Sequence, residues 1–318
     1  MENKYVCKVC GNSNFNSPFV AKDLMFKNDT EFVYFECSEC HCVQINEIPD
    51  NIADFYPSNY LSFGKPAFSK KMNPVRTFLK KNFASYNNGN FNLVGFLLSF
   101  VFENELPWLK PELINFNSSV LDVGCGTGKF LITMERHGFT NLTGVDPFIS
   151  NDITCGDNIK IYKKTIFEVK EKYDLIMLHH SFEHMENPDS VLKELSGLLN
   201  ENGCILIRIP LAGSYAWRRY KNFWVQLDAP RHLFLHTARS MSLLAEKSNL
   251  NIENINYESN EFQFVVSEKY IRGFNFKDDN RMFTKEQLST FKKEAIKLNQ
   301  LNDGDCACFY IRKKSNQK

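Results

Sequence analysis

The sequence has no long hydrophobic run and no excess of charge of one sign. Its first residues, MENKYVCK, are polar, and the longest apolar stretch, FNLVGFLLSFVF at 91–102, falls short of the roughly 20 apolar residues that cross a bilayer. We therefore expect a cytosolic protein with no signal peptide and no membrane partner, in which residues 91–102 form a buried or lid helix. Because 38 Lys and Arg nearly balance 37 Asp and Glu, the net charge of +1 creates no field that attracts nucleic acid.

The chain also lacks internal repeats and low-complexity tracts, and its pattern changes twice along its length. Residues 1–45 contain paired cysteines and predict a small zinc-binding ribbon. Residues 46–110, rich in Pro, Asn and Phe, predict a helical connector or lid. From 111 to 318, short apolar runs alternate with amphipathic segments, as in parallel βαβ units. With 43% hydrophobic residues in 318, the chain can bury one full core and a smaller module.

Disulfides are not expected, because a chain without an export signal is predicted to keep its ten cysteines as thiols or metal ligands. Two CxxC pairs, Cys7 with Cys10 and Cys37 with Cys40, are separated by 26 residues. Each CxxC turn points two thiolates at one ion, and two such turns complete a tetrahedral four-sulfur shell. A closed shell of this kind predicts a structural zinc. His41 or Cys42 could replace Cys40, which we favour on spacing.

The βαβ region predicts seven strands and three amphipathic helices. A helix is expected from Lys129 to a stop at Gly138, another with Asn187 as N-cap and Pro188 as its first residue, and a third opening at Thr237. The strands are expected at 119–125, 141–146, 159–166, 173–180, 203–210, 251–259 and 306–313.

A glycine-rich turn follows the first of these strands, in VLDVGCGTGKFL at 120–131. In a doubly wound sheet this loop lies at the carboxyl edge, where ligands bind, and Gly124, Gly126 and Gly128 let the backbone approach a ligand closely. A dinucleotide fingerprint would read GxGxxG beside a pyrophosphate. Here the order is GxGxG, and the acid Asp122 precedes the first glycine, which suits a ligand that carries positive charge.

The segment DVGCGTG resembles motif I of the class I S-adenosylmethionine (SAM)-dependent methyltransferases. The resemblance implies an α/β, Rossmann-like, doubly wound sheet of seven strands with SAM as cofactor. It implies that the loop, which includes Cys125 and Thr127, passes beneath the methionine part of SAM while Asp122 orients the ammonium group. Asp146 would bind the ribose hydroxyls, a role that NAD would also accept. The remaining residues expected around the cofactor are Pro147, Ile166, Phe167 and His179.

The fourth strand ends in HHSFEHMENP, which in many members of that family faces the transferring methyl and the acceptor. Because a sulfonium is already a good leaving group, the protein must mainly align the acceptor and remove its proton. Histidine suits the second task because its pKa is close to working pH. The candidate catalytic residues are therefore His180, Glu183 and His184. Alternatively, Glu183 and His184 only cap and pack the next helix.

The segment LAGSYAWRRYKNFWVQLDAPRHLFLHT, at 211–237, is too long for an ordinary loop between a strand and a helix, and such insertions are usually functional. Its indoles and guanidinium groups would suit a nucleotide-linked sugar. The alternative is an aromatic lid that excludes water. The candidate substrate ligands are Trp217, Arg218, Arg219, Trp224, Asp228 and Arg231, and His232 with Asp228 forms a possible acid and base pair.

Taken together, the ribbon, the covering helices and the SFEH and LDAPRH segments resemble bacterial methyltransferases of polysaccharide and deoxysugar pathways, including zinc-containing sugar C-methyltransferases. The resemblance implies a small-molecule acceptor, a nucleotide sugar, and in the best-known case a Tyr/His set that removes a proton from carbon. SFEH supplies His184 without an adjacent tyrosine, so O-methylation stays open. An RNA methyltransferase and a SAM-binding scaffold are the alternatives. No oligomeric state is predicted.

Overall fold

The structure, a computed structural model, describes residues 5–56, 73–87, 89–110 and 113–314. Two compact units make up the chain, and each is discontinuous in sequence. Unit 1 comprises residues 1–57, 180–192 and 207–311, and unit 2 comprises residues 58–179, 193–206 and 312–318. The expected division into three consecutive domains at 45 and 110 stays a prediction.

Unit 2 contains the parallel core of the larger sheet. β4 pairs in parallel with β5 and β8, and β5 pairs in parallel with β7. All five residues of β8 from Leu175 to His179 are buried, as expected for a central strand covered on both faces. The strands are β4 (Ser119–Val123), β5 (Asn141–Val145), β6 (Ile153–Cys155), β7 (Ile159–Tyr162), β8 (Tyr173–His179) and the first part of β9 (Leu199–Pro210).

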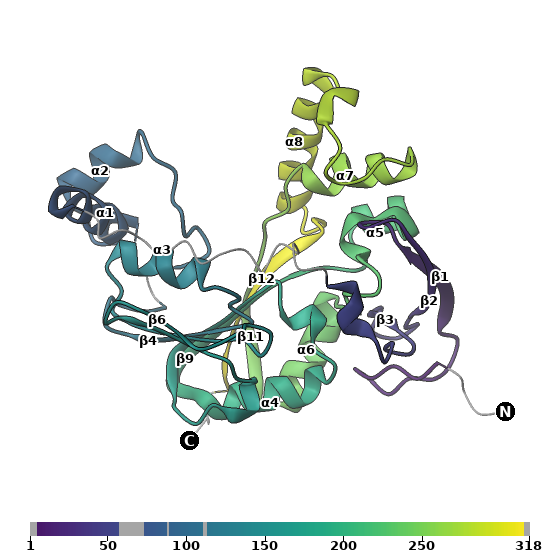
Figure 1. The fold of residues 1–318 in the computed structure, drawn as a ribbon, viewed down its shortest axis with the longest axis horizontal. Helices are drawn as coiled ribbons and strands as arrows, with labels where there is room; N and C mark the ends of the chain where they lie inside the picture. Colours follow the sequence, from purple (N-terminus) through teal and green to yellow (C-terminus); the bar gives the residue numbers. More distant parts are fainter. Residues whose placement is uncertain (1–4, 57–72, 88, 111–112, 315–318) are drawn as a thin grey trace. The chain divides into compact units, whose positions relative to one another are not determined.

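The helices of unit 2 follow from the apolar spacing of their residues. α3 (Lys129–His137) buries Leu131, Ile132 and Met134 and ends at Gly138, whose φ of 106° is accessible to glycine. Figure 1 shows α3 along one face of the strands, with α1 (Pro74–Asn87) and α2 (Leu93–Ser99) beyond it. The predicted start and stop of α3 are confirmed.

For residues 91–102 a buried or lid helix is expected; the buried alternative is wrong, and the lid stays a prediction. Phe91, Leu93 and Phe100 are 76%, 65% and 74% exposed. α2 packs on α1 at Gly95, where an added Cβ would lie 2.4 Å from Cβ of Tyr86, so the two backbones approach closely there, and the rings of Phe96 and Tyr86 also meet, with 6.0 Å between their centroids. Periodicity in the sequence predicted the helix but could not show which face has a partner.

Unit 1 contains a small sheet with the strand order β1-β2-β3-β10. Its pairs are antiparallel, and the last strand comes from the long insertion, where Phe234 and Leu235 pair with Gln44 and Val43. The N-terminal ribbon is therefore completed by residues almost 200 positions later. The strands are β1 (Ser17–Asp23), β2 (Asn28–Glu36), β3 (Val43–Ile45) and β10 (Phe234–Leu235).

The rest of unit 1 extends the larger sheet and adds helices. The larger sheet has the strand order β11-β12-β9-β8-β4-β5-β7-β6. The further elements are β11 (Leu250–Tyr257), β12 (Cys306–Lys313), η1 (Ile52–Phe55), η4 (Phe182–His184), α4 (Pro188–Leu198), α5 (Tyr215–Tyr220), α6 (Ala238–Lys247), α7 (Phe262–Ile271) and α8 (Lys285–Gln300).

The predicted α/β fold class is confirmed, with all seven predicted strands present. Thr237 caps α6 through its side chain, and Pro188 is the first residue of α4, as predicted. The eighth strand, β6, was not predicted because its three residues, ITC, are too few to show an alternation of apolar and polar residues. It is held by antiparallel pairing with β7. α5, α7 and α8 were also not predicted.

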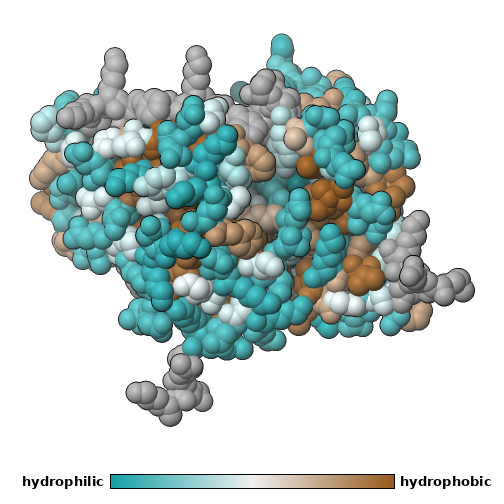
Figure 2. Space-filling model, turned by 60° about the horizontal axis from the view of Figure 1, so that its bottom comes forward, coloured by the Kyte–Doolittle hydropathy of each residue, from teal (hydrophilic) through white to brown (hydrophobic). Residues whose placement is uncertain are grey.

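The face drawn in Figure 2 is largely hydrophilic, with hydrophobic side chains scattered among polar ones. None of the helices in the described ranges has the length and apolarity that a transmembrane span requires.

Candidate functional site

The glycine turn after β4 adopts backbone angles that side chains rarely allow. The φ angles of Gly124, Gly126 and Gly128 are 73°, 53° and 79°. The amide of Gly124 donates to the carbonyl of Val145 at 2.8 Å, which ties the turn to the end of β5. At Gly128, an added Cβ would lie 2.4 Å from Cδ1 of Ile161 in β7. The glycines are therefore required by both backbone conformation and space.

Two carboxylates lie at this turn and have different surroundings. Asp122 is buried, and its Oδ2 has no hydrogen-bond partner among the described residues. Burial and the charge of Asp146 raise the pKa of Asp122 to about 8. Asp146 instead accepts the amides of Gly126 and Phe148, each at 2.8 Å. Asp146 thus fixes the turn, and each of its oxygens keeps a lone pair for a ligand.

Two features of the residues around the turn fit SAM. A buried carboxyl oxygen without a partner can accept a hydrogen bond from a ligand, and the ammonium group of the methionine part of SAM supplies a charged donor. Flat surfaces lie on neighbouring elements: the His179 ring packs 4.2 Å from the Phe130 ring and 4.4 Å from Trp108, by their centroids. Phe167 is 48% exposed and available to an adenine, whereas Ile166 is buried and contributes to the core. Cys125 and Thr127 are partly exposed in the turn, and Pro147 is exposed.

Gly128→Ala is expected to lower SAM affinity and the melting temperature. The left-handed φ costs about 1–2 kcal/mol for a side chain, and the clash with Ile161 adds to it. Ile161→Val removes the atom that clashes. The double variant should therefore recover the part of the loss that comes from the clash and keep the part that comes from the left-handed backbone at residue 128. Calorimetry and thermal melts of the four proteins measure the coupling. Equal losses with and without Ile161→Val would contradict the packing account.

The four cysteines predicted as a metal site lie together in unit 1. Their sulfur atoms are all within 4.8 Å of one another, with 3.6 Å between Cys7 and Cys40 and 3.5 Å between Cys10 and Cys37. A tetrahedral ion with bonds of about 2.3 Å has ligand edges of about 3.8 Å, so the set is compatible with zinc. The cluster includes Cys40 and excludes both alternatives: His41 has a half-exposed side chain, and Cys42 is buried elsewhere.

The two cysteine turns have the same local geometry. Gly11 donates its amide to the carbonyl of Cys7 at 2.8 Å, and His41 does the same to Cys37 at 3.0 Å; both residues have positive φ. The amide of Gln44 donates to the Cys7 sulfur at 3.1 Å, as expected for a thiolate ligand with an orienting partner. A hydrogen bond with Cys40 lowers the pKa of Cys7 to about 5, which favours its thiolate.

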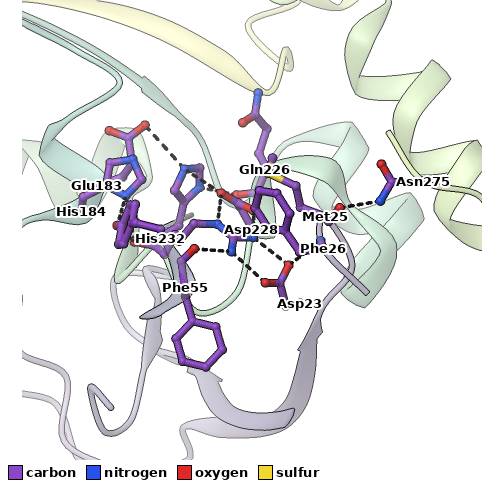
Figure 3. A network of polar contacts seen from close by, with 12 residues as sticks. Asp23, Met25, Phe26, Phe55, Glu183, His184, Gln226, Asp228, His232 and Asn275 are labelled. Carbon is purple, nitrogen blue, oxygen red and sulfur yellow. Dashed lines mark hydrogen bonds and ion pairs between the residues drawn. The ribbon is translucent and has the colours of Figure 1, made fainter. Parts of the chain in front are cut away.

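A second polar cluster in unit 1 gathers residues of the HHSFEH segment and the insertion. Oε1 of Glu183 lies 4.0 Å from Nε2 of His232 (Figure 3). The same oxygen lies 3.4 Å from Nδ1 of His180. Nδ1 of His184 is 2.8 Å from the carbonyl of Arg231 and 3.1 Å from the hydroxyl of Tyr56. The structure therefore brings together the predicted residues His180, Glu183, His184 and His232, and adds Tyr56.

Burial sets the protonation of this cluster. Burial alone would raise the pKa of Glu183, but the nearby imidazole of His180 and the charges of His184 and His232 lower it to about 2. Burial lowers the pKa of His232 to about 4, and its Nδ1 donates to the carbonyl of Gln226 at 2.6 Å. At neutral pH the cluster thus holds a carboxylate beside a neutral imidazole.

The insertion at 211–237 differs from what we expected. The indoles of Trp217 and Trp224 are buried and donate to Glu36 and Asp305, so neither presents a face to a ligand. The physical reason is the pairing of β10 with β3, which draws the segment into the core of unit 1. Both indoles are therefore core residues and not substrate ligands or an exposed lid.

The arginines of the insertion are also bonded within the unit. All five N–H donors of the fully buried Arg231 are used: by Asp23, Asp228 and the carbonyl of Phe55. Arg231 and Asp228 are thus occupied with each other and are not retained as substrate ligands. Arg218 and Arg219, which pair with Asp303 and Glu268, are half exposed and still reach solvent.

A family model described as a methyltransferase domain matches residues 78–255, more than half of the chain. The chain belongs to the SAM-dependent methyltransferase-domain family. The EEF1A lysine methyltransferase 2 of Danio rerio is 49% identical over 39 residues, which are 12% of this chain and 17% of that protein. A tRNA U34 carboxymethyltransferase of Nautilia profundicola is 26% identical over 141 residues, 41% and 47% of the two chains. This chain thus covers less than half the length of each.

One further relative and one solved structure are also similar to this chain. A ubiquinone biosynthesis O-methyltransferase of Rickettsia felis is 31% identical over 97 residues, 28% of this chain and 39% of that protein. The solved structure of coclaurine N-methyltransferase with N-methylheliamine and SAH covers 84% of this chain and 80% of its own, at 14% identity and a TM-score of 0.42. A likeness this weak says nothing about the acceptor.

Sequence reasoning missed three residues of these sites. Tyr56 lies in FYPSNY, a stretch that was assigned only to the connector, and reaches His184 across 128 residues. Trp108 and Phe130 flank His179, although the spacing of Phe130 indicated only a core position on α3. An aromatic residue on the first turn after the glycine loop was the available signal for Phe130.

Proposed function

We propose that the protein transfers the methyl group of SAM to a small acceptor, a nucleotide-linked sugar. The observation that carries the SAM part is the buried, unpartnered oxygen of Asp122 at the head of a glycine turn, in a chain of the methyltransferase-domain family. The sugar part rests on the resemblance of the whole layout to the polysaccharide and deoxysugar methyltransferases.

In the proposed reaction an acceptor oxygen or carbon attacks the methyl carbon, the bond from carbon to sulfur breaks, and S-adenosylhomocysteine leaves. The acceptor proton goes to an imidazole of the polar cluster. His180 and His184 suit this role, because their rings are partly exposed whereas His232 is buried. His179 of the proposed cofactor site and His180 of this cluster are consecutive residues in the sequence.

The contact of Tyr56 with His184 supports a sugar acceptor. A Tyr/His set is what the resemblance to sugar C-methyltransferases implies, and the tyrosine absent from SFEH is supplied by Tyr56, 3.1 Å from Nδ1 of His184. Burial raises the pKa of Tyr56, so the phenol stays protonated and acts as a hydrogen-bond partner and not as the base. Methylation of either carbon or oxygen is consistent with this arrangement.

The four-cysteine cluster is proposed to hold a structural zinc. All four ligand positions of a tetrahedral ion are filled by sulfur, which leaves none for a substrate. Its role would be to hold together the turn that precedes β1 and the turn that joins β2 to β3 in unit 1.

The proposal is tested by mass spectrometry of nucleotide sugars incubated with the protein and SAM. A gain of one methyl on a nucleotide sugar supports it. Methylation of tRNA alone in a parallel reaction would favour the RNA alternative, and SAM binding without any methylated sugar or RNA would favour the scaffold.

His184→Gln is expected to lower turnover at least about tenfold with little change in SAM affinity, because a base contributes to proton transfer and not to cofactor binding. His41→Gln, at a half-exposed histidine outside the cluster, is the matched control. Wild-type turnover in His184→Gln would remove this residue from the catalytic set.

A further inference from the structure

Glu183, His184 and His232 form a second candidate metal set, separate from the cysteines. One oxygen or nitrogen from each lies within 4.8 Å of the other two. We infer that these three residues bind one divalent cation of the zinc, iron or cobalt class. All three belong to unit 1, and Figure 3 shows both imidazole rings beside the carboxylate.

Both imidazoles are oriented as metal ligands are. A carbonyl oxygen only accepts hydrogen bonds, so Nδ1 of His184 carries the hydrogen that it shares with the carbonyl of Arg231 at 2.8 Å. For the same reason Nδ1 of His232 donates to the carbonyl of Gln226 at 2.6 Å. In each ring Nε2 is left with its lone pair. Donation from the other ring nitrogen to a backbone carbonyl is the usual support of a metal-bound histidine.

The carboxylate of Glu183 supplies the independent observation. Its side chain is 0% exposed, yet neither oxygen has a hydrogen-bond partner within the described residues. The nearest nitrogens are Nδ1 of His180 at 3.4 Å and Nε2 of His232 at 4.0 Å, both from Oε1. An ionised carboxylate removed from water without full hydrogen bonding is costly. A cation on the side of the two Nε2 atoms would satisfy it.

The donor set selects the class of cation. Two imidazoles and one carboxylate suit borderline transition ions, whereas magnesium and calcium prefer oxygen alone. Such ions have bonds of about 2.0–2.2 Å, hence tetrahedral ligand edges of about 3.4 Å. Nε2 of His232 and Oε1 of Glu183 are 4.0 Å apart, so these two atoms must move closer together when the ion binds. His184 is only partly buried, which leaves an open side for a further ligand.

Given the proposed methyl transfer, on which this step rests, the open side would take an oxygen of the acceptor. A bound cation lowers the pKa of a coordinated hydroxyl, so the acceptor loses its proton near neutral pH. The proton would go to His180, which is not one of the three ligands and whose ring is 44% exposed. The acceptor would then carry a hydroxyl, or a carbonyl next to the carbon that is methylated.

Cobalt(II) is the probe that separates this set from the cysteines. The full chain is first loaded with one equivalent of zinc, which the four thiolates bind in preference to the nitrogen and oxygen ligands, and is then titrated with Co²⁺ without SAM or acceptor while the visible spectrum is recorded. We expect one further equivalent with the weak bands of nitrogen and oxygen ligation and no sulfur charge-transfer band. Glu183→Gln, which keeps the shape of the side chain, should weaken this binding by about tenfold or more. His41→Gln should bind as the wild type does.

His232→Asn serves as a second variant should Glu183→Gln fail to fold, and thermal melts of the cobalt-free proteins check both. No binding of Co²⁺ at millimolar concentration, or binding that both variants leave unchanged, would overturn the proposal. Because acceptor and SAM are absent, this result stands apart from the proposed function: cobalt binding without any methylated product would leave the cation site intact and defeat only the reaction.

Discussion

Cys7→Ser is expected to lower the melting temperature of unit 1 by about 10 °C. Cys7 is buried and is one of four sulfurs within 4.8 Å, so its loss opens a closed shell. Removal of one metal ligand is among the few changes that cost about 4 kcal/mol, and each kcal/mol shifts the melting temperature of a unit of this size by about 2–4 °C. Calorimetry, with elemental analysis for zinc, measures both quantities.

Cys42→Ala is the matched control for this prediction. Cys42 is equally buried and adjacent in sequence but lies outside the metal set, so its loss should cost only about 1 kcal/mol of cavity. A strong chelator should reproduce the effect of Cys7→Ser on the wild type and have little further effect on the variant. A zinc-free preparation whose melt equals that of the loaded protein would show that the cluster holds no structural metal.

Asp122→Asn is expected to weaken SAM binding by about 100-fold. The variant keeps the size of the side chain but removes the charge that the buried ammonium needs, and loss of one partner of a buried charged pair costs about 2–5 kcal/mol. The fold should survive, because Asp122 is buried beside Asp146 and its pKa of about 8 shows that the neutral form is already favoured there. Unchanged affinity by calorimetry would refute the assignment of the turn.

The raised pKa of Asp122 also predicts a proton linkage. Without ligand the carboxyl is mostly protonated at pH 7, and a bound ammonium lowers its pKa, so binding releases a proton. SAM affinity should therefore rise with pH from 6 to about 7.5, below the range in which an α-amino group loses its own proton. Calorimetry in buffers of different ionisation enthalpy should detect this proton in the wild type and none in Asp122→Asn.

Local patterns predicted the parallel core well because each strand and helix there is encoded by neighbouring residues. The apolar run of β8 and the stripe of α4 predict buried elements wherever they are placed. The turn between β4 and α3 was also predictable, since its three glycines and Asp122 lie within seven residues. The spacing of two CxxC pairs likewise predicted the sulfur cluster, because the geometry of each turn is local.

The polar cluster and the insertion could not be predicted in the same way. Trp224 and Arg231 have the composition of a ligand surface, yet their partners Asp305 and Asp23 lie 81 and 208 residues away. Without those partners a buried indole and an exposed one cannot be told apart. The contact of Tyr56 with His184 and the exposed face of α2 likewise could not be predicted, because both depend on partners that the local sequence does not reveal.

The sequence by itself determined the seven main strands and three helices of the α/β region, the glycine turn with its acid, and the four sulfurs, since each depends on residues close in the chain. Only the tertiary structure decided that the N-terminal ribbon is completed by Phe234 and Leu235, that the insertion is core, and that the buried carboxylate of Glu183 lies near the imidazoles of His184 and His232 without a hydrogen-bond partner among the described residues. These depend on burial and on long-range partners, and the free energy of a polar group is set by what surrounds it and not by its neighbours in sequence.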